Sequence, residues 1–528
     1  MSCSLPTRPR VFWWIAILGL VAASCTVGPN YAPPKAKVAG QWSENAVVTN
    51  RPPSQAGALW WRGLADPVLD GLVETAYRNN PSLQIAGVRI LEARARLNKS
   101  IGELFPQQQG VSSQVGYTHL SDGLTSKIPG INPDYAAAQA LFGATWEIDF
   151  WGKYRRGIES DRAAYLGSIA AYDDALVTLI ADVASSYVNF RTAEERLRVA
   201  RRNLVIQQES LRIAKVQFAA GETSQRDALE AETEVAQTES QLPRLEQTLA
   251  QARNGLTVLV GERQQETGRR LAVAGRIPTA PTNVVAGIPH DLLRRRPDVR
   301  AAGFAAAAKS ALIGVAKAQM YPALSLSGKF GAAGNNEFGQ TLGDMFSWQN
   351  RALSAGAGLV WPVFNYGRLV NQVRVQDAQF QEAVLNYQNT VLVAQQEVEN
   401  GLTAFAEQQR VASLLENAAA SARRSTALAL LQYEAGQTDY DTVVIAEQGE
   451  LAVEDALAST QGNIVLALIS VYRALGGGWE LRAGRDVISD AVKAEMARRT
   501  DWGRMLEPAK HLPSNPPKKD AGEHQNGP

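Results

Sequence analysis

The sequence predicts a mixed fold in which each chain contributes four membrane-spanning β-strands and long coiled-coil-like helices, arranged as two tandem repeats. The repeat is visible directly, because Gln217–Thr223 reappears as Gln432–Thr438, 215 positions later. Long stretches with apolar residues three or four apart predict the helices, and short stretches that alternate apolar with small or polar residues predict the strands. A period this long indicates two copies of a large unit, since solenoid repeats recur every ~20–50 residues.

Further matching residues extend the duplication along the chain, so each copy is predicted to contain a helix, a pair of strands and two more helices. The matches are Trp146 with Trp361, Gly152 with Gly367, and Gly261 with Gly476 at an offset of 215, and Pro81 with Pro297 and Leu104–Pro106 with Met320–Pro322 at an offset of 216. The predicted segments are a signal peptide at 1–24, a lipidated extended segment at 25–66, a first repeat at 67–261, a connection at 262–289, a second repeat at 290–477, a further segment at 478–506 and a disordered tail at 507–528.

The composition excludes several classes of protein. The 53 basic and 52 acidic residues nearly cancel, so no nucleic-acid partner is predicted. Cys3 and Cys25 both lie near the N-terminus, which excludes a disulfide framework for the body of the chain. The histidines are scattered and none is paired with a plausible nucleophile. We therefore predict no metal site, no catalytic site and no enzymatic activity.

The N-terminus has the features of an export signal. Arg8 and Arg10 supply the charged region, residues 11–21 the apolar run, and residues 22–24 the small residues of a cleavage site. Cys25 directly after them is the arrangement of a bacterial lipobox, which predicts a diacylglycerol on its sulfur and an acyl chain on the new amino group. Several acyl chains anchor a protein firmly in a membrane. The alternative is an ordinary signal peptide followed by an incidental cysteine.

A long helical hairpin is predicted after the strands of copy one. Residues 153–218 contain no proline and carry apolar residues at alternating spacings of three and four, which predicts a helix about 100 Å long at 1.5 Å per residue. Gly221 is expected to end this helix in a left-handed conformation, and a return helix follows from Ser224 to Val260. Its Gln- and Glu-rich positions are interpreted as a solvated face. These positions are Glu230, Glu232, Glu234 and Gln237.

Copy two repeats this hairpin, with helices predicted at 368–433 and 439–475 and a turn at Gly436. A shorter helix precedes each pair of strands, at 68–103 and at 290–319. Periodicity alone is also compatible with a soluble coiled-coil spacer or an adhesion stalk.

The predicted strands argue against a simple spacer. They lie at 107–118, 138–150, 323–333 and 352–363, and their length of about ten residues suits a tilted membrane-spanning strand. One face is apolar and the other small and polar, as expected of a barrel with lipid outside and water inside. Aromatic residues near the helix-proximal ends are interpreted as an interfacial girdle. They are Trp146, Phe150, Trp151 and Trp361. An ordinary half-buried sheet, which also alternates, is the alternative.

Four strands cannot close a barrel. An open sheet edge in lipid leaves backbone donors and acceptors unsatisfied, so the barrel must close between chains. Two chains would supply eight strands, the smallest bacterial barrel, and three chains would supply twelve. An oligomer is therefore required.

Four motifs make the chain resemble the outer membrane factors, the channel-forming lipoproteins of tripartite RND-type multidrug efflux systems. The resemblance covers essentially the whole mature chain. The motifs are Cys-Thr-Val-Gly-Pro-Asn-Tyr at 25–31, Trp-Trp at 60–61, Asp-Phe-Trp-Gly at 149–152 and Gly-Ile-Pro-His-Asp-Leu-Leu-Arg-Arg-Arg-Pro-Asp-Val at 287–299.

The resemblance implies a homotrimer with one 12-stranded barrel in the outer membrane, continued by a helical tunnel across the periplasm. It implies an equatorial girdle from 262–289 and 478–506, and partners in a periplasmic adaptor, an inner-membrane pump and outer-membrane lipid. Thr26 after the cysteine goes with outer-membrane sorting in similar lipoproteins. The run Arg294–Asp298 is expected to have a structural role, because Pro and Asp also suit a helix start.

The periplasmic helix tips near Gly221 and Gly436 are the expected control point of a passive channel. In the family, aspartates on the first turns of the return helices line the closed entrance, and Asp227 matches that pattern. Copy two has Thr442 and Ile445 at the corresponding positions, which puts an aspartate ring in doubt. The substitutes considered are Asp439, Tyr440 and Asp441. Solvated acids that favour a helix start are the alternative.

The function predicted from these features is passive conduction of small molecules such as drugs through the outer membrane. A type I protein-secretion channel and a non-channel coiled-coil structural lipoprotein are the alternatives. The lipobox and the Arg-Arg-Pro-Asp run argue against the first, and the strands argue against the second.

Overall fold

The computed structural model describes residues 26–35, 38, 40–42, 58–121, 133–273, 275–283, 295–336 and 341–507. The signal peptide, Cys25, residues 287–294 of the fourth motif and residues 508–528 of the predicted tail lie outside the described residues. The chain divides into two compact units. The strand unit comprises Met1–Pro34, Glu92–Gly167 and Ala302–Tyr387, and the hairpin unit comprises Lys35–Leu91, Ser168–Ala301 and Gln388–Pro528.

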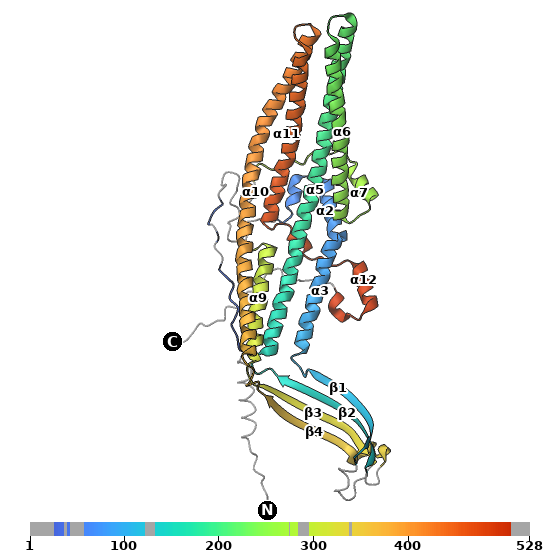
Figure 1. The fold of residues 1–528 in the computed structure, drawn as a ribbon, viewed down its shortest axis with the longest axis vertical. Helices are drawn as coiled ribbons and strands as arrows, with labels where there is room; N and C mark the ends of the chain where they lie inside the picture. The colour runs from blue at the N-terminus through green and yellow to red at the C-terminus, as the bar shows by residue number, and fades with distance from the viewer. Residues whose placement is uncertain are drawn as a thin grey trace, which may run out of the picture. The chain divides into compact units, whose positions relative to one another are not determined.

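The strand unit contains one antiparallel sheet with the order β1-β2-β3-β4 (Figure 1). The strands are β1 (Gln108–His119), β2 (Asp134–Ile148), β3 (Ala323–Asn335) and β4 (Arg351–Val360). β2 starts four residues before the expected boundary, where Asp134 pairs with His119 of β1. β4 ends at Val360 rather than near 363, and Pro362 cannot donate to a ladder there. β1 and β4 form the two edges, and within the described part of the chain neither has a second neighbouring strand.

The register gathers apolar side chains on one face of this sheet. Phe142 lies opposite Val111 on one side and Phe330 on the other, and Phe330 lies opposite Leu353. Each of these four side chains is at least 50% exposed. Large apolar side chains exposed together mark a surface that is covered by lipid or another protein.

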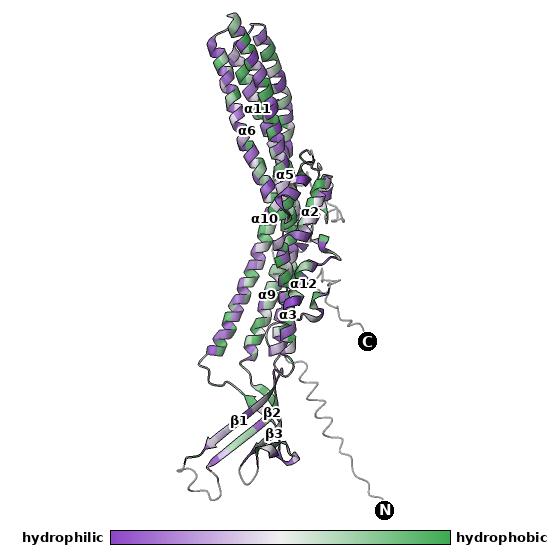
Figure 2. Cartoon of the chain, turned by 90° about the vertical axis from the view of Figure 1, so that its right-hand side faces the viewer, coloured by the Kyte–Doolittle hydropathy of each residue, from purple (hydrophilic) through white to green (hydrophobic). Residues whose placement is uncertain are grey.

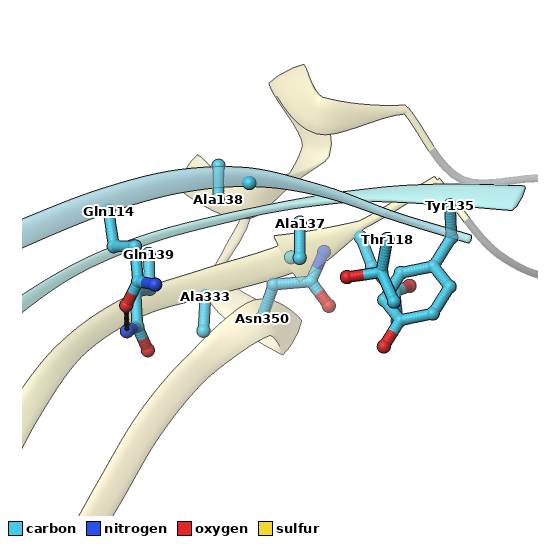
Figure 3. A pocket seen from close by; sticks show the side chains of 11 residues that line it. Gln114, Thr118, Tyr135, Ala137, Ala138, Gln139, Ala333 and Asn350 are labelled. Carbon is cyan, nitrogen blue, oxygen red and sulfur yellow. Dashed lines mark hydrogen bonds between the residues drawn. The ribbon is translucent and has the colours of Figure 1, made fainter. Parts of the chain in front are cut away.

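The opposite, concave face is small and polar, as the alternating pattern predicts. Gln114, Gln139 and Asn350 point into a hollow of about 520 Å³, whereas Ala138 points away from it (Figure 3). Gln139 donates from Nε2 to Oε1 of Gln114 over 3.0 Å. Lys329, opposite Gly143 of β2, adds a positive charge to the same face.

The N-terminal segment is bound where β2 leads into α5 (Lys153–Ala220). Val27 donates its backbone N–H to the Trp151 carbonyl over 3.0 Å. Arg156 donates to the Val27 carbonyl over 3.3 Å and to Asn30 Oδ1 over 2.8 Å. Gly152 has φ 80°, and a Cβ there would come within 2.7 Å of Thr26. Residues 26–30 are therefore held tightly against this junction.

The junction also changes the interpretation of one predicted girdle residue. The Trp151 ring stacks on Tyr321 with a centroid distance of 4.5 Å, and its Nε1 donates to the Pro322 carbonyl over 2.8 Å. Trp151 is half-buried, so it packs within the protein rather than standing free at a membrane surface.

Two long helical hairpins dominate the hairpin unit. The first is formed by α5 and α6 (Gln225–Val260), and the second by α10 (Arg368–Glu434) and α11 (Tyr440–Ala474) (Figure 1). Gly221 and Gly436 have φ values of 77° and 66°, the left-handed conformation expected of residues that end a helix. The other described elements are η2 (Trp60–Leu64), α2 (Pro67–Asn79), α3 (Pro81–Gly102), α7 (Gln264–Leu271), α9 (Pro297–Ala318), η3 (Leu342–Phe346), η4 (Trp348–Asn350), η5 (Trp479–Arg482), α12 (Asp490–Arg499) and η6 (Gly503–Leu506).

The helix predicted at 68–103 is wrong as a single element. It breaks between α2 and α3, where Asn80 has an extended ψ of 119°. The following Pro81 explains the break, because proline disfavours the helical conformation of the residue before it. Asn80 makes the bend stable by accepting from the Leu83 N–H over 2.9 Å and donating to the Leu259 carbonyl over 2.9 Å.

Residues 478–506 pack against α2 and α3 within the hairpin unit. Tyr77 donates to the Asp486 carbonyl over 3.1 Å, and a Cβ on Gly87 would come within 2.3 Å of the Val487 carbonyl oxygen. Asp173 is fully buried and is paired with Arg482 and, over 3.5 Å, with Arg300.

Candidate functional site

The turns of the two hairpins form the candidate control site. Each turn has a glycine in the left-handed conformation, followed by an extended residue that precedes the return helix. That residue is Ser224 in copy one and Asp439 in copy two, with ψ 156° in both. The duplication therefore places two equivalent helix starts, those of α6 and α11, in the same unit. Their side chains differ, and the difference determines the chemistry of the site.

The two helix starts carry a charged link that joins the copies. Arg226 on α6 donates to Asp441 on α11 over 2.8 Å and also pairs with Glu230 over 3.1 Å. Arg226 and Asp441 occupy the same position in their repeats, so equivalent sites carry opposite charges. Because Arg226 and Asp441 are more than half exposed, the pair contributes little to stability and can separate at low energetic cost.

The predicted gate residues fall into different environments. Asp227 is half-buried and accepts from Ser224 Oγ over 2.7 Å, as expected of an acid in a first helical turn. Asp439 and Asp441 are exposed. Tyr440, by contrast, is only 1% exposed and packs edge-on against Tyr433 at 5.1 Å. In the single chain Tyr440 therefore belongs to the core of the hairpins, while the assignment of the three aspartates to a gate stays a prediction.

A buried polar seam lies behind these turns. Up to Ala200, the buried side chains of α5 are mainly apolar. Beyond Ala200, three buried side chains are polar, those of Asn203, Gln207 and Ser210. They face buried acids on the return helices. Hydrophilic and hydrophobic residues are accordingly mixed along α6 and α11 (Figure 2).

Each buried acid of the seam has defined partners. Glu454 accepts from Arg423 over 2.6 Å and from Asn203 over 3.1 Å, and is also paired with Arg202. Glu234 accepts from Gln448 over 2.7 Å, so its interpretation as part of a solvated face was wrong. Glu234 shares helical spacing with the buried residues Ala231 and Thr238, which places it on the packed face of α6.

Glu447 is the acid of this seam whose charge is most strongly disfavoured. It is 1% exposed, accepts a hydrogen bond from Ser210, and has one carboxylate oxygen without a partner. Burial, together with the negative charges of Glu234 and Glu450, raises the pKa of Glu447 to about 7. The hydroxyl of Tyr440 is also buried without a partner, and burial and the charge of Glu447 raise its pKa.

The sequence patterns did not single out Arg226 or the buried acids of α11 as parts of a site. Glu447, Glu450 and Glu454 are spaced three and four residues apart, so they lie on one face of α11. That spacing was available as a signal, but acids on a helix face are usually solvated, and only the packing of α5 against α11 shows that these are not.

The Arg-Pro-Asp run has a structural role where it is described. Arg296 is 7% exposed and donates to the Ala474 carbonyl over 2.7 Å, to Asp298 over 2.7 Å and to Glu397 over 2.8 Å. It thereby ties the start of α9 to the end of α11 and to α10. Among the described residues, no group of three or more His, Cys, Asp or Glu side chains is arranged to hold a metal ion.

The family of the chain follows from comparison with known proteins. The sequence model of the Outer membrane efflux protein family matches the chain at residues 72–262 and 288–477. These matches cover more than half of the chain, and the chain belongs to this family. It is therefore a transport protein of the outer membrane with a long helical periplasmic extension.

Individual relatives are similar over nearly their whole length. The pyoverdine export outer membrane protein OpmQ of Pseudomonas putida is 30% identical over 480 residues, which cover 90% of this chain and 98% of that protein. Nodulation protein T of Rhizobium leguminosarum bv. viciae is 29% identical over 464 residues, 88% and 93% of the two chains. The solved structure of the outer-membrane channel OprN matches with a TM-score of 0.79 and 30% identity, over 86% of this chain and 100% of its own.

Glu447 generates a pH-dependence prediction. The folded hairpin keeps a proton that the unfolded chain releases near pH 4.5, so the folded state holds more protons between about pH 4.5 and 7. Stability of the hairpins should therefore fall as pH rises through this window, by on the order of 3 kcal/mol at most. Glu447→Gln should remove this loss. Hydrogen exchange of the turn peptides, corrected for intrinsic rates, should show less opening in Glu447→Gln at pH 8 and little change at pH 5.

Glu232 provides the matched control, because it occupies the position of Glu447 in copy one and is exposed. Glu232→Gln should leave the opening unchanged at both pH values. Equal opening of Glu447→Gln and the parent protein at pH 8 would contradict the assignment.

Proposed function

We propose that this chain is the outer-membrane channel of a tripartite efflux pump. Three copies would form one 12-stranded barrel and one helical tunnel, which accept small molecules such as drugs from a periplasmic adaptor and an inner-membrane pump. The observation that carries the proposal is the four-stranded sheet, which has an apolar exposed face, a polar concave face and two unpaired edges. Membership of the Outer membrane efflux protein family supports it.

Conduction through such a channel is passive. The concave face offers amides, small side chains and the Lys329 ammonium, which suit a water-filled passage and provide no shaped pocket for one cargo. The relatives' names point to different biological roles, pyoverdine export and nodulation. We therefore infer that the inner-membrane pump, which supplies the energy, also selects the cargo.

The gate of the proposed channel is the pair of hairpin turns. Closed and open states would differ in whether the copy-two hairpin stays against copy one, where Arg226 and Asp441 now form their exposed pair. The aspartates Asp227 and Asp439 would add negative charge to the entrance, and a ring of acids attracts cations. The buried seam holds the helices together further from the turns, so separation would be confined to the tips.

A tether tests this gate. In the double variant Arg226→Cys with Asp441→Cys, a short bismaleimide should join α6 to α11 and abolish efflux, measured as drug accumulation in cells that lack their own channel. The control is Arg196→Cys with Asp455→Cys, since these residues pair over 2.7 Å on α5 and α11 away from the turns. This second tether should leave efflux intact.

The two ways of failing are distinguishable. Normal efflux by the tip-tethered protein would contradict the gate and leave the channel standing. If the untreated parent chain, expressed with its adaptor and pump, failed to support any efflux, the proposed function itself would be wrong.

We also propose that Cys25 carries an S-diacylglycerol and an N-acyl chain. Thr26, the next residue, is held beside Gly152 at the junction of β2 and α5. Adjacent Cα atoms are 3.8 Å apart, so the acyl chains would enter lipid at the helix-proximal end of the sheet. Trp146 and Trp361, both more than a third exposed, lie at that end.

Lipidation predicts a modified N-terminal peptide. Mass spectrometry of protein extracted from outer membranes should find a peptide that begins at Cys25 and carries the mass of a diacylglycerol and an amide-linked acyl chain. The Cys25→Ser variant should lack this peptide and retain the signal sequence. An unmodified peptide that begins at Cys25 in the parent protein would exclude the proposal.

A further inference from the structure

A contact inside the chain provides a template for one between chains. At the end of copy one, the Trp151 ring stacks on Tyr321 and its Nε1 donates to the Pro322 carbonyl. Tyr321 and Pro322 begin the strand pair of copy two. This contact therefore runs from the end of one repeat to the start of the next.

The duplication preserves the contacts within each repeat at this junction, although the backbone differs at one position, where Tyr366 has a positive φ and its counterpart Trp151 does not. Trp146 donates from Nε1 to the Leu104 carbonyl over 3.1 Å, and its counterpart Trp361 donates to the Met320 carbonyl over 3.2 Å. Gly152 and Gly367 have φ values of 80° and 78°. The contacts within each repeat are thus reproduced in both copies.

Among the described residues, the contact between repeats is made once. The counterpart of Trp151 is Tyr366, whose side chain is completely exposed, at 102%. Tyr366 also has φ 49°, a left-handed conformation that is uncommon for a residue other than glycine. An aromatic ring stands where copy one has one, but none of the residues that the structure describes covers it.

The matching receiving surface is exposed as well. The counterparts of Tyr321 and Pro322 are Phe105 and Pro106, at the start of the copy-one strands, and Phe105 is 61% exposed. Each chain therefore has an exposed aromatic ring, Tyr366, at the end of copy two. It also has an exposed aromatic surface, Phe105 with Pro106, at the start of copy one.

We propose that Tyr366 of each chain packs on Phe105 and Pro106 of the next copy, and so acts as an aromatic clasp between subunits. The proposal rests on the proposed function, since it requires the barrel to close between chains. The contact is head-to-tail, with different surfaces on the two partners, and such contacts form a ring when the rotation from one copy to the next closes on itself.

The sheet register extends the clasp into a defined strand pairing. The β1–β2 pair Gln108 with Thr145, moved by 215 positions, becomes the observed β3–β4 pair Ala323 with Val360. The β2–β3 pair Phe142 with Phe330 can be moved in the same way. This places Ala357 of β4 opposite Val115 of β1 in the next copy. Both residues lie on the apolar face of the sheet, as a continuous barrel requires.

A second copy fits these aromatics better than a lipid surface does. Lipid headgroups also favour tyrosine and tryptophan, but Trp151 at the equivalent position is turned into protein. Its neighbour in the sequence, Phe150, packs edge-on against it at 4.8 Å. Phe105 is the copy-one counterpart of Tyr321, on which Trp151 stacks. A contact with lipid would not require an aromatic ring at that position.

Photo-crosslinking from the position of Tyr366 tests the clasp. The probe p-benzoylphenylalanine replaces Tyr366 in the full chain, which is co-expressed in outer membranes with a differently tagged parent copy. Illumination should join the two tags, and the adduct should map to the peptide that contains Phe105. The same probe at Val375, an exposed position on α10, should give no adduct with that peptide. Adducts only with lipid, or only within one chain, would overturn the clasp.

Two variants provide an independent readout. Tyr366→Ala should increase the dissociated fraction of the detergent-solubilised assembly at a given temperature by roughly three- to tenfold, because one aromatic contact is lost at each interface. Tyr366→Trp, which introduces the residue found at this position in copy one, should leave the dissociated fraction as it is in the parent protein. Equal dissociation of the alanine variant and the parent would overturn the proposal.

Failure of the clasp is separable from failure of the channel. The variant Ala357→Cys with Val115→Cys should form a disulfide between chains under oxidation, whereas Ala357→Cys with Tyr117→Cys should not. A disulfide without a Tyr366 adduct would reject the clasp and retain barrel closure. A chain that remains monomeric in all these experiments would reject the proposed channel as well.

Discussion

The unpaired edges of the sheet are the constraint on which the rest of the structure rests. Among the residues that the structure describes, no strand pairs with the outer side of β1 or of β4, which leaves a row of backbone donors and acceptors there. In hydrocarbon each unsatisfied group costs several kcal/mol, so an open sheet with the apolar face seen here cannot exist alone in a bilayer. Closure between copies removes both edges at once. The required oligomer and the exposed aromatic residues Phe105 and Tyr366, at the two edges of the sheet, are consistent with this one requirement.

The duplication explains how one chain could serve the proposed symmetric assembly without being symmetric itself. The sheet and its junctions keep equivalent contacts, as the tryptophans Trp146 and Trp361 show. The hairpin turns do not, since Arg226 and Asp441 occupy equivalent positions with opposite charges. Behind the turns, Glu447 and its neighbours replace apolar packing with polar contacts. Because burial raises the pKa of Glu447, we expect the stability of the hairpins to depend on pH.

Much of the fold could be predicted because the spacing of apolar residues along the sequence follows the periods of strands and helices. Alternation identified the apolar face around Phe142, and the change to spacings of three and four identified the hairpins. The helix break at Asn80 had a local signal in the following proline that the periodic pattern obscured. The burial of Glu234 and Tyr440 had no such signal, because an acid on a helix face or an aromatic residue after a turn suits either solvent or a core. Only the packing of four helices decides between them.

The number of chains in the assembly tests the central claim most directly. Native mass spectrometry of the full-length protein, extracted from outer membranes in detergent, measures it without any variant. We expect a single species with three times the mass of the lipidated chain, so that three four-stranded sheets supply twelve strands. A species with one chain would contradict the claim that the sheet edges close between copies. A species with two or four chains would contradict the 12-stranded barrel.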